Sequence, residues 1–221
     1  MSTEQEKPTI IYIYDVICGW CYGFSPVMKA LHEKYKDQFE FQVLSGGMIL
    51  GDRVGPISQM ADIIKSSYKS VEERSGVKFG DKFINEVVEE GTMILSSEKP
   101  SIALSVFKTY RPEDAILFAS DMQYALNHDG MDLNLDDTYK LLIAKYNIPE
   151  NEFIQKLNDE EFRQLAYYDV ALSRQLQVTG YPAVLIKTSE LNFHLIAKGY
   201  ADLETMELRV QNVIKEEGLK L

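Results

Sequence analysis

The sequence contains few residues of the kinds that usually bind metals. Its 221 residues include two cysteines and three histidines, and the histidines lie far from one another and from the cysteines. A structural zinc site normally needs four ligands, so this composition argues against zinc. We expect His32, His128 and His194 to be surface residues, and we expect no bound metal and no other bound cofactor.

The sequence also lacks an excess of basic residues and any long apolar segment. It has 23 Lys and Arg against 34 Asp and Glu, a formal net charge of −11, and such an acidic chain is a poor partner for nucleic acid and anionic lipid. No apolar run approaches the roughly 18 residues of a membrane helix, and the first residues show no secretory signal. We therefore expect a cytoplasmic protein with no nucleic-acid or membrane partner. The sequence leaves its oligomeric state open.

Both cysteines fall in one short motif, Cys18-Gly19-Trp20-Cys21, between a strand pattern and a helix pattern. Reducing compartments rarely use structural disulfides, so a lone pair at this spacing indicates redox chemistry or metal binding. The first turn of a helix has unpaired backbone N–H groups and the positive end of the helix dipole. We therefore expect Cys18 to ionise more readily than a free thiol, whose pKa is about 8.5.

The rest of the chain predicts an α/β protein built in three parts. An apolar run, a helical pattern and an alternating run give a βαβ unit, in which parallel pairing is the default. From Met48 to about Leu176 only helical patterns occur, and two strands and a helix then close the chain. The expected strands are residues 9–16, 39–44, 183–186 and 193–198, and the expected first and last helices are residues 19–36 and 203–214.

This arrangement resembles the thioredoxin fold, and its helical insertion resembles the DsbA-like branch of that fold. Pro26, eight residues after Cys18, matches the helix-kinking proline of thioredoxin-like proteins, and Tyr181-Pro182 matches their cis-proline element. The segment from Asp15 to Tyr22 is similar to the cytosolic FrnE-like proteins. The resemblance implies a thioredoxin-like domain of residues 1–47 plus 178–221 and an all-helical insertion of residues 48–177.

The resemblance implies a thiol–disulfide oxidoreductase that exchanges disulfides with proteins or small thiols. Cys18 would be the exposed nucleophile that forms a mixed disulfide, and Cys21, more buried, would resolve it. Thioredoxin or glutathione would be the external redox partner, and the direction of electron flow stays open. The expected substrate-binding residues are Trp20, Gly180, Tyr181 and Pro182. For Trp20, packing against the insertion is an equal alternative.

Three positions near the motif have roles that the sequence leaves open. Asp15 would raise the pKa of Cys18 if it lies close and unpaired, or it caps the helix. Thioredoxin keeps a buried acid six residues before its first cysteine, and this chain has Tyr12 there. The pair Gly46-Gly47 allows a close backbone approach or a positive φ, and it either lines the substrate groove or is simply a loop.

Other functions compete with this interpretation. One is an adaptor that presents partners to a protease and uses the thiols as a redox switch. Another is a glutathione-dependent transferase or isomerase of the kappa-like branch, although those proteins usually carry serine where Cys18 stands. An iron–sulfur cluster shared by two chains and an inert buried pair complete the alternatives.

Overall fold

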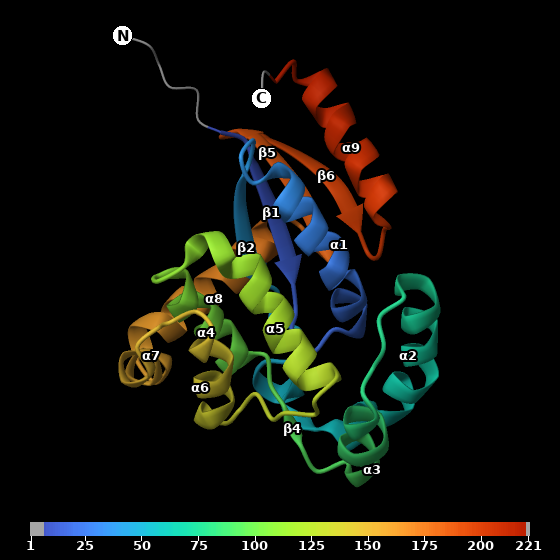
Figure 1. Ribbon diagram of the computed structural model, residues 1–221, viewed down its shortest axis with the longest axis vertical. Helices are drawn as coiled ribbons and strands as arrows, with labels where there is room; N and C mark the ends of the chain where they lie inside the picture. Colours follow the sequence, from blue (N-terminus) through green and yellow to red (C-terminus); the bar gives the residue numbers. More distant parts are fainter. Residues whose placement is uncertain (1–6, 220–221) are drawn as a thin grey trace.

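The computed structural model describes residues 7–219 and has a four-stranded sheet at its centre (Figure 1). The strand order is β2-β1-β5-β6. β1 pairs in parallel with β2, whereas β5 pairs antiparallel with both β1 and β6. The strands are β1 (Thr9–Tyr14), β2 (Glu40–Ser45), β5 (Ala183–Ser189) and β6 (Asn192–Lys198).

Two helices complete the βαβ and ββα halves that the sequence predicts. α1 (Gly19–Tyr35) joins β1 to β2 and continues through Pro26, and α9 (Leu203–Glu216) follows β6. α9 packs on both α1 and β6. The α/β class and the expected order of elements are confirmed. β1 is shorter than expected, because the chain turns after Tyr14 and the side chain of Asp15 accepts a hydrogen bond from the Ile17 N–H.

The continuous apolar character of β1 arises from burial on both faces of the sheet. Ile10 and Tyr12 belong to the large cluster that includes α1, and Ile11 and Ile13 face the opposite way. On that second side, Leu172 of α8 and residues just after it cover the sheet. Successive strand side chains point to opposite faces, so a strand covered on both sides loses the alternation of a half-buried strand.

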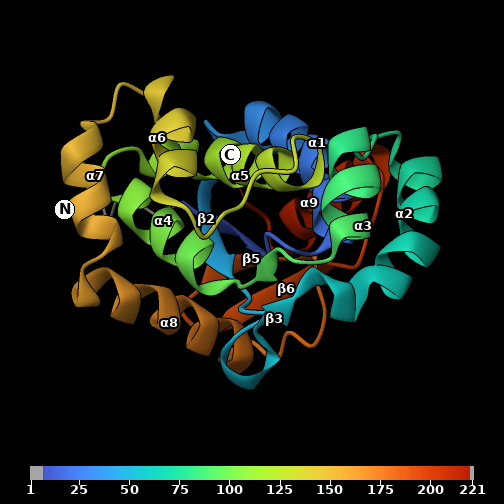
Figure 2. The same ribbon diagram turned by 90° about the horizontal axis from the view of Figure 1, so that it is seen from below.

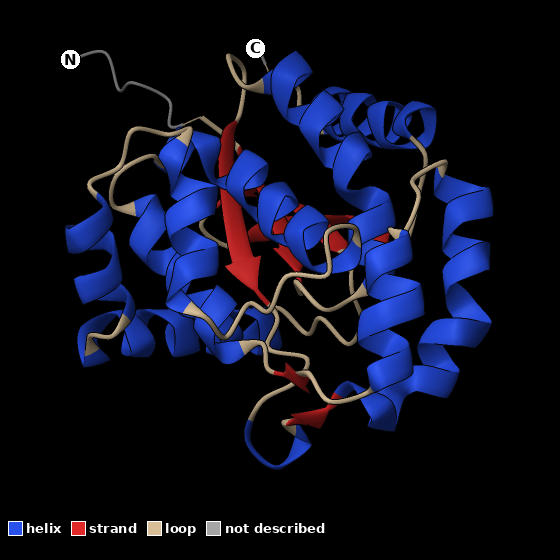
Figure 3. Ribbon diagram, turned by 60° about the horizontal axis from the view of Figure 1, so that its bottom comes forward, coloured by secondary structure: helices blue, strands red, loops and turns tan. Residues whose placement is uncertain are grey.

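The segment between the two halves is helical, as expected, and surrounds one end of the sheet (Figures 1 and 2). It also contains two strands that the sequence did not predict, β3 (Gly55–Pro56) and β4 (Ile94–Leu95), which pair antiparallel away from the main sheet (Figure 3). Two residues are too few to produce an alternating pattern. The longer helices are α2 (Ala61–Ser75), α4 (Glu98–Lys108), α5 (Ala115–Asn127), α6 (Asp136–Ala144), α7 (Glu150–Leu157) and α8 (Glu160–Gln175).

Shorter helical turns connect these helices. A π-helical turn, η3 (Lys82–Val87), leads into α3 (Val88–Glu90). The 3-10 turns are η1 (Gly51–Arg53), η2 (Ile57–Met60) and η4 (Pro112–Asp114). In the part of the chain that the structure describes, no helix has the length and apolar character needed to cross a membrane.

One buried apolar cluster runs through both the sheet half and the helical half of the molecule. It contains Phe24 and Met28 of α1 together with Phe107 of α4, Phe118 of α5 and Phe153 of α7. α1 packs directly on α2 and α5. The division into a domain of residues 1–47 plus 178–221 and an insertion of residues 48–177 therefore stays a prediction. The two segments share one buried core.

Candidate functional site

The two cysteines lie where the chain enters α1. Cys18 is the residue just before the helix, and Cys21 lies in the first turn. Both are free thiols. Cys18 is 9% exposed and Cys21 is 0% exposed, so the expectation of an exposed Cys18 is wrong. Its side chain packs into the same apolar cluster as Cys21, although it also lines an open pocket.

The two thiols differ in their tendency to ionise. The pKa of Cys18 is lowered, because the Cys21 thiol and the backbone N–H groups of Cys21 and Trp20 hydrogen-bond its charged form, while burial and the charge of Asp15 act in the opposite direction. The pKa of Cys21 is raised well above its ordinary value, first by burial and then by Cys18. The expected easy ionisation of Cys18 agrees with this direction, since Cys18 is the thiol of the pair that forms a thiolate more readily.

A loop more than 160 residues away completes the surroundings of Cys18. The Tyr181–Pro182 peptide bond is cis. The Cys18 thiol donates a hydrogen bond to the Tyr181 carbonyl oxygen, with an S···O distance of 3.7 Å. Downstream of this bond, the Gly199 N–H donates to the carbonyl of Pro182 at 2.7 Å, which fixes the loop to the end of β6.

Gly46 holds the Tyr181 ring in place. The phenol of Tyr181 donates a hydrogen bond to the Gly46 carbonyl at 2.7 Å. A Cβ atom at Gly46 would overlap the ring of Tyr181, whereas a Cβ atom at Gly180 would meet nothing within 4 Å. The close approach that a glycine allows is therefore made at Gly46 by the Tyr181 ring, and a role of this pair in lining the groove stays a prediction.

Asp15 connects three segments beneath the motif. It is 2% exposed and accepts hydrogen bonds from Ile17 N at 3.0 Å, Met48 N at 2.6 Å and Ser97 Oγ at 3.0 Å. Because Ile17 precedes α1, Asp15 is not a cap of that helix. Burial raises the pKa of Asp15 despite these bonds, and its charge raises the pKa of Cys18. Asp15 is therefore near Cys18 but not unpaired as expected, and its role in setting the reactivity of Cys18 stays a prediction.

Trp20 is half-buried between the motif and the insertion. Its ring lies 6.3 Å from the ring of Tyr200, and the Arg74 guanidinium of α2 lies 5.8 Å from the centre of the Trp20 ring. Trp20 also lines the pocket beside Cys18. Trp20 therefore packs on the insertion while it lies beside Cys18, and its contact with a substrate stays a prediction.

Tyr12 lies on the α1 side of the sheet, where thioredoxin has its buried acid. The ring is 2% exposed, and its hydroxyl has no hydrogen-bond partner of good geometry among residues 7–219. The pKa of Tyr12 is raised well above its ordinary value, first by burial and next by the nearby Cys21. This chain therefore places a neutral phenol beneath the motif, where thioredoxin has a carboxylate.

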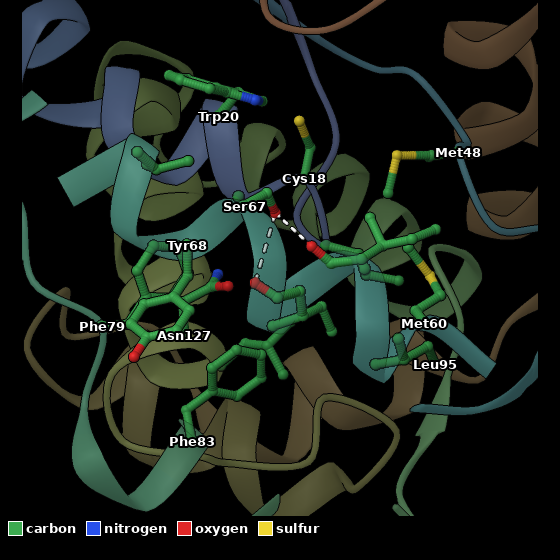
Figure 4. Close-up of a pocket in the computed structure, with 16 residues that line it drawn as sticks. Cys18, Trp20, Met48, Met60, Ser67, Tyr68, Phe79, Phe83, Leu95 and Asn127 are labelled. Carbon is green, nitrogen blue, oxygen red and sulfur yellow. Dashed lines mark hydrogen bonds between the residues drawn. The ribbon is translucent and has the colours of Figure 1, made fainter. Parts of the chain in front are cut away.

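An apolar pocket of about 230 Å³ opens beside Cys18. Figure 4 shows Cys18, Trp20 and Met48 at one end of it and Phe83 and Leu95 at the other. Nothing in the sequence indicated this pocket, since the residues of α2 that line it appear there only as one apolar helix face. The helix pattern identifies a buried face, but it does not indicate that the face is left partly open beside a thiol. Other lining residues are Met60, Ile64, Ser67, Tyr68 and Phe79.

A second hollow, of about 580 Å³, lies at the other end of α1 and is polar. His32 lines it and is only 8% exposed, with its ring 4.8 Å from that of Phe41, so the expected surface position of His32 is wrong. The helix turns this ring inward onto β2. His128 and His194 are half-buried and lie beside Asp129 and Glu217. Within residues 7–219, no three His, Cys, Asp or Glu side chains come together as metal ligands would.

Comparison with known proteins shows the fold. No family model matches the chain. A solved structure from Nitrosomonas europaea, provisionally described as a protein disulfide isomerase, aligns with TM-score 0.84 at 24% identity over 96% of this chain and 99% of that one. The cytosolic disulfide reductase DsbM from Pseudomonas aeruginosa aligns with TM-score 0.79 at 17% identity over 96% of this chain and 100% of that one. A structure of DsbM with glutathione aligns similarly, with TM-score 0.76. The DsbA-like thioredoxin fold is therefore confirmed.

The fold occurs with more than one activity. A 2-hydroxychromene-2-carboxylate isomerase aligns with TM-score 0.66 at 11% identity over 95% of this chain and 98% of that one. Among curated proteins, the ClpXP adapter protein SpxH of Halalkalibacterium halodurans is 20% identical over 188 residues. That match covers 81% of this chain, and the chain spans only 58% of the length of the adapter. The arrangement of side chains, rather than the fold, must therefore distinguish the activities.

Proposed function

We propose that this chain is a thiol–disulfide oxidoreductase in which Cys18 attacks and Cys21 resolves. The observation that carries the proposal is the pairing of two unequal thiols, one with a lowered and one with a raised pKa, beside the carbonyl of Tyr181. A thiolate is the reactive form in disulfide exchange. An inert buried pair would not need one thiol to ionise easily and to line an open pocket.

The proposed reaction consumes one disulfide and one pair of thiols. The Cys18 thiolate attacks one substrate sulfur, a mixed disulfide forms, and the other substrate sulfur leaves as a thiolate. Cys21 then loses its proton and attacks the Cys18 sulfur, which releases the second substrate thiol and leaves a Cys18–Cys21 disulfide. The protein loses two electrons and the substrate gains them. The same steps in reverse oxidise a substrate.

Tyr181, Pro182, Gly180 and Trp20 would form the substrate groove. Pro182 has no N–H group, so the backbone of Tyr181 is available to pair with an extended substrate as an added strand does. Gly180 leaves open space next to this backbone, and Trp20 lines the other side of the thiol.

Glutathione or thioredoxin would return the pair to its starting state, with no bound cofactor. The glutathione-bound structure of the Pseudomonas relative supports a small-thiol partner, and its description as a cytosolic disulfide reductase supports a cytoplasmic protein and the reducing direction. Equilibrating the Cys18–Cys21 pair with glutathione decides the direction. A potential near −270 mV, as in thioredoxin, indicates a reductase, and one near −120 mV, as in DsbA, indicates an oxidant.

The test is to trap the mixed disulfide. We expect Cys21→Ser, incubated with oxidised glutathione, to gain one glutathionyl group on Cys18 by mass spectrometry, because no resolving thiol remains. Cys18→Ser is the matched control and should gain little, since the pKa of Cys21 is raised and its side chain is 0% exposed. Equal labelling of the two variants would contradict the assigned roles.

A protease adaptor is the second candidate, and the similarity to the ClpXP adapter favours it specifically. Replacing both cysteines by serine separates the two functions. An oxidoreductase loses disulfide exchange with the double variant, whereas an adaptor retains delivery of its partner to the protease. The kappa-like glutathione transferases and isomerases are less compatible, because they usually carry serine at the position of Cys18.

A further inference from the structure

No acidic or basic side chain of the described residues lines the pocket beside Cys18, although 26% of the chain is Asp, Glu, Lys or Arg. None of its lining side chains, all within residues 7–219, is Asp, Glu, Lys, Arg or His. Two of its polar side chains hydrogen-bond to nearby backbone, since the Ser67 hydroxyl donates to the Ile63 carbonyl at 2.6 Å and the Asn127 amide donates to the Gln123 carbonyl at 2.9 Å. Arg74, which lies over Trp20, is not among the lining residues.

The size of the pocket fits one ring with a few further atoms. Its volume is about 230 Å³, and an apolar cavity of roughly 150 Å³ binds benzene. Aromatic, thioether and aliphatic side chains, including Phe79, Met60 and Ile64, make up most of the lining. Apolar groups gain by leaving water for such a surface, whereas a charged group loses its hydration without a partner.

The position of the pocket connects it to the reacting sulfur. Cys18 is itself a lining residue, at the same end as Trp20 and Met48 (Figure 4). On the proposed function, a mixed disulfide on Cys18 brings the substituent of the substrate sulfur to this opening. We infer that the pocket binds an uncharged, ring-sized apolar group of a small-molecule disulfide, and that such disulfides are the preferred substrates.

This inference excludes glutathione as the occupant of the pocket, although glutathione remains a partner that regenerates the thiols. Its two carboxylates and its ammonium group would find no charged side chain among the lining residues. A folded protein is also a poor occupant, because the Cys18 sulfur belongs to a side chain that is only 9% exposed.

The experiment compares two uncharged probes with and without a ring. Reduced protein reacts with 4,4′-dithiodipyridine or with bis(2-hydroxyethyl) disulfide. In each case one probe disulfide and two protein thiols give two probe thiols and the Cys18–Cys21 disulfide. The remaining protein thiols are counted by quenched alkylation, so both probes share one readout. In the wild type, we expect the single-turnover rate to saturate with concentration for the ring-bearing probe and to rise linearly for the other.

A matched pair of variants on α2 tests whether the pocket is responsible. Ser67→Phe places a ring inside the pocket, and Ser66→Phe places the same ring on the exposed neighbouring position. We expect Ser67→Phe to slow the ring-bearing probe about tenfold or more and to change the other probe less than twofold. Ser66→Phe should leave both rates unchanged. Ser67→Leu is a milder variant in case Ser67→Phe does not fold.

The outcomes separate this inference from the proposed function. If the wild type oxidises with neither probe, the proposed function itself fails. If it oxidises with both but shows no saturation, and Ser67→Phe slows both equally or neither, exchange occurs and the pocket plays no selective part. A faster reaction with a cysteine-containing peptide disulfide than with 4,4′-dithiodipyridine would also overturn the preference for small molecules.

Discussion

The two hollows at the ends of α1 differ in volume and in the side chains that line them. The hollow at the C-terminal end is the larger, about 580 Å³ against about 230 Å³, and charged side chains such as Lys29, Glu33 and Lys36 line it. The pocket at the N-terminal end is apolar and contains Cys18. If cavity volume alone were used to locate the functional site, it would therefore point to the end of α1 that has no cysteine.

The direction of the helix explains the difference in chemistry. The N-terminal end presents unpaired N–H groups and partial positive charge, which stabilise a thiolate, and the C-terminal end presents carbonyl oxygens and partial negative charge. The last turn of α1 accordingly contains His32 and Lys34. A nucleophilic cysteine is favoured at one end of this helix only.

The largest expected effect tests whether the chemistry resides at the N-terminal end alone. Cys18→Ser should lower the rate of disulfide exchange by about a thousandfold or more, since loss of a nucleophile removes the reacting atom. Lys29→Ala, at the polar hollow, should change the rate less than twofold. Stopped-flow oxidation of the reduced protein measures both. A large loss in Lys29→Ala would break the comparison.

The next prediction concerns the close packing near Cys18. Gly46→Ala forces a methyl group against the Tyr181 ring, and overpacking of this kind typically costs about 1–3 kcal/mol. We expect its urea unfolding midpoint to fall, because the Tyr181 ring must leave its place at the Gly46 carbonyl. We also expect disulfide exchange to slow, because Tyr181 belongs to the proposed substrate groove. Gly180→Ala, with open space at its Cα, is the control. Equal unfolding midpoints for the two variants would contradict this account.

A smaller effect separates the contribution of Cys21 from that of the helix. The Cys21 thiol is the main cause of the lowered pKa of Cys18, so Cys21→Ala should move the alkylation profile of Cys18 to higher pH. Cys21→Ser retains a hydroxyl donor and should move it less. Rates with iodoacetamide between pH 5 and 10 measure the shift. If both variants kept the alkylation profile of the wild type, the lowered pKa of Cys18 would be due to the helix N-terminus alone.

The smallest effect belongs to the polar end of α1. Burial lowers the pKa of His32, so the folded protein binds fewer protons than the unfolded chain just below the ordinary histidine pKa of about 6.5. The free energy of unfolding should therefore fall as pH decreases through that value. His32→Gln should weaken this dependence, and urea unfolding at pH 7.5 and 5.5 measures it. A variant with an unchanged slope would contradict the burial argument.

The sequence predicted the features that follow from local patterns, namely the helices and strands and their order. It did not predict the features that depend on packing between distant segments. The βαβ and ββα halves and the start of α1 follow from periodicity. Helix chemistry predicts the direction of the Cys18 pKa, although the Cys21 thiol is the main cause of the shift. The burial of Cys18 and His32 depends on contacts with segments far along the chain, which one sequence does not reveal. The pocket depends on how α2 and residues 79–83 sit against the motif, so it too required three-dimensional information.

The hydrogen bonds of Asp15 determine which side of the pocket beside Cys18 is able to move. The Asp15 carboxylate fixes the end of β1 to Met48 and, through Ser97, to the start of α4. This side of the pocket therefore cannot move without breaking buried hydrogen bonds. On the opposite side, α2 contacts the motif through apolar and cation–aromatic contacts. Such contacts change at a lower cost in free energy than buried hydrogen bonds do. A ring-bearing disulfide should therefore enter and leave the pocket by outward movement of α2. Amide hydrogen exchange should accordingly be faster in α2 than in α4.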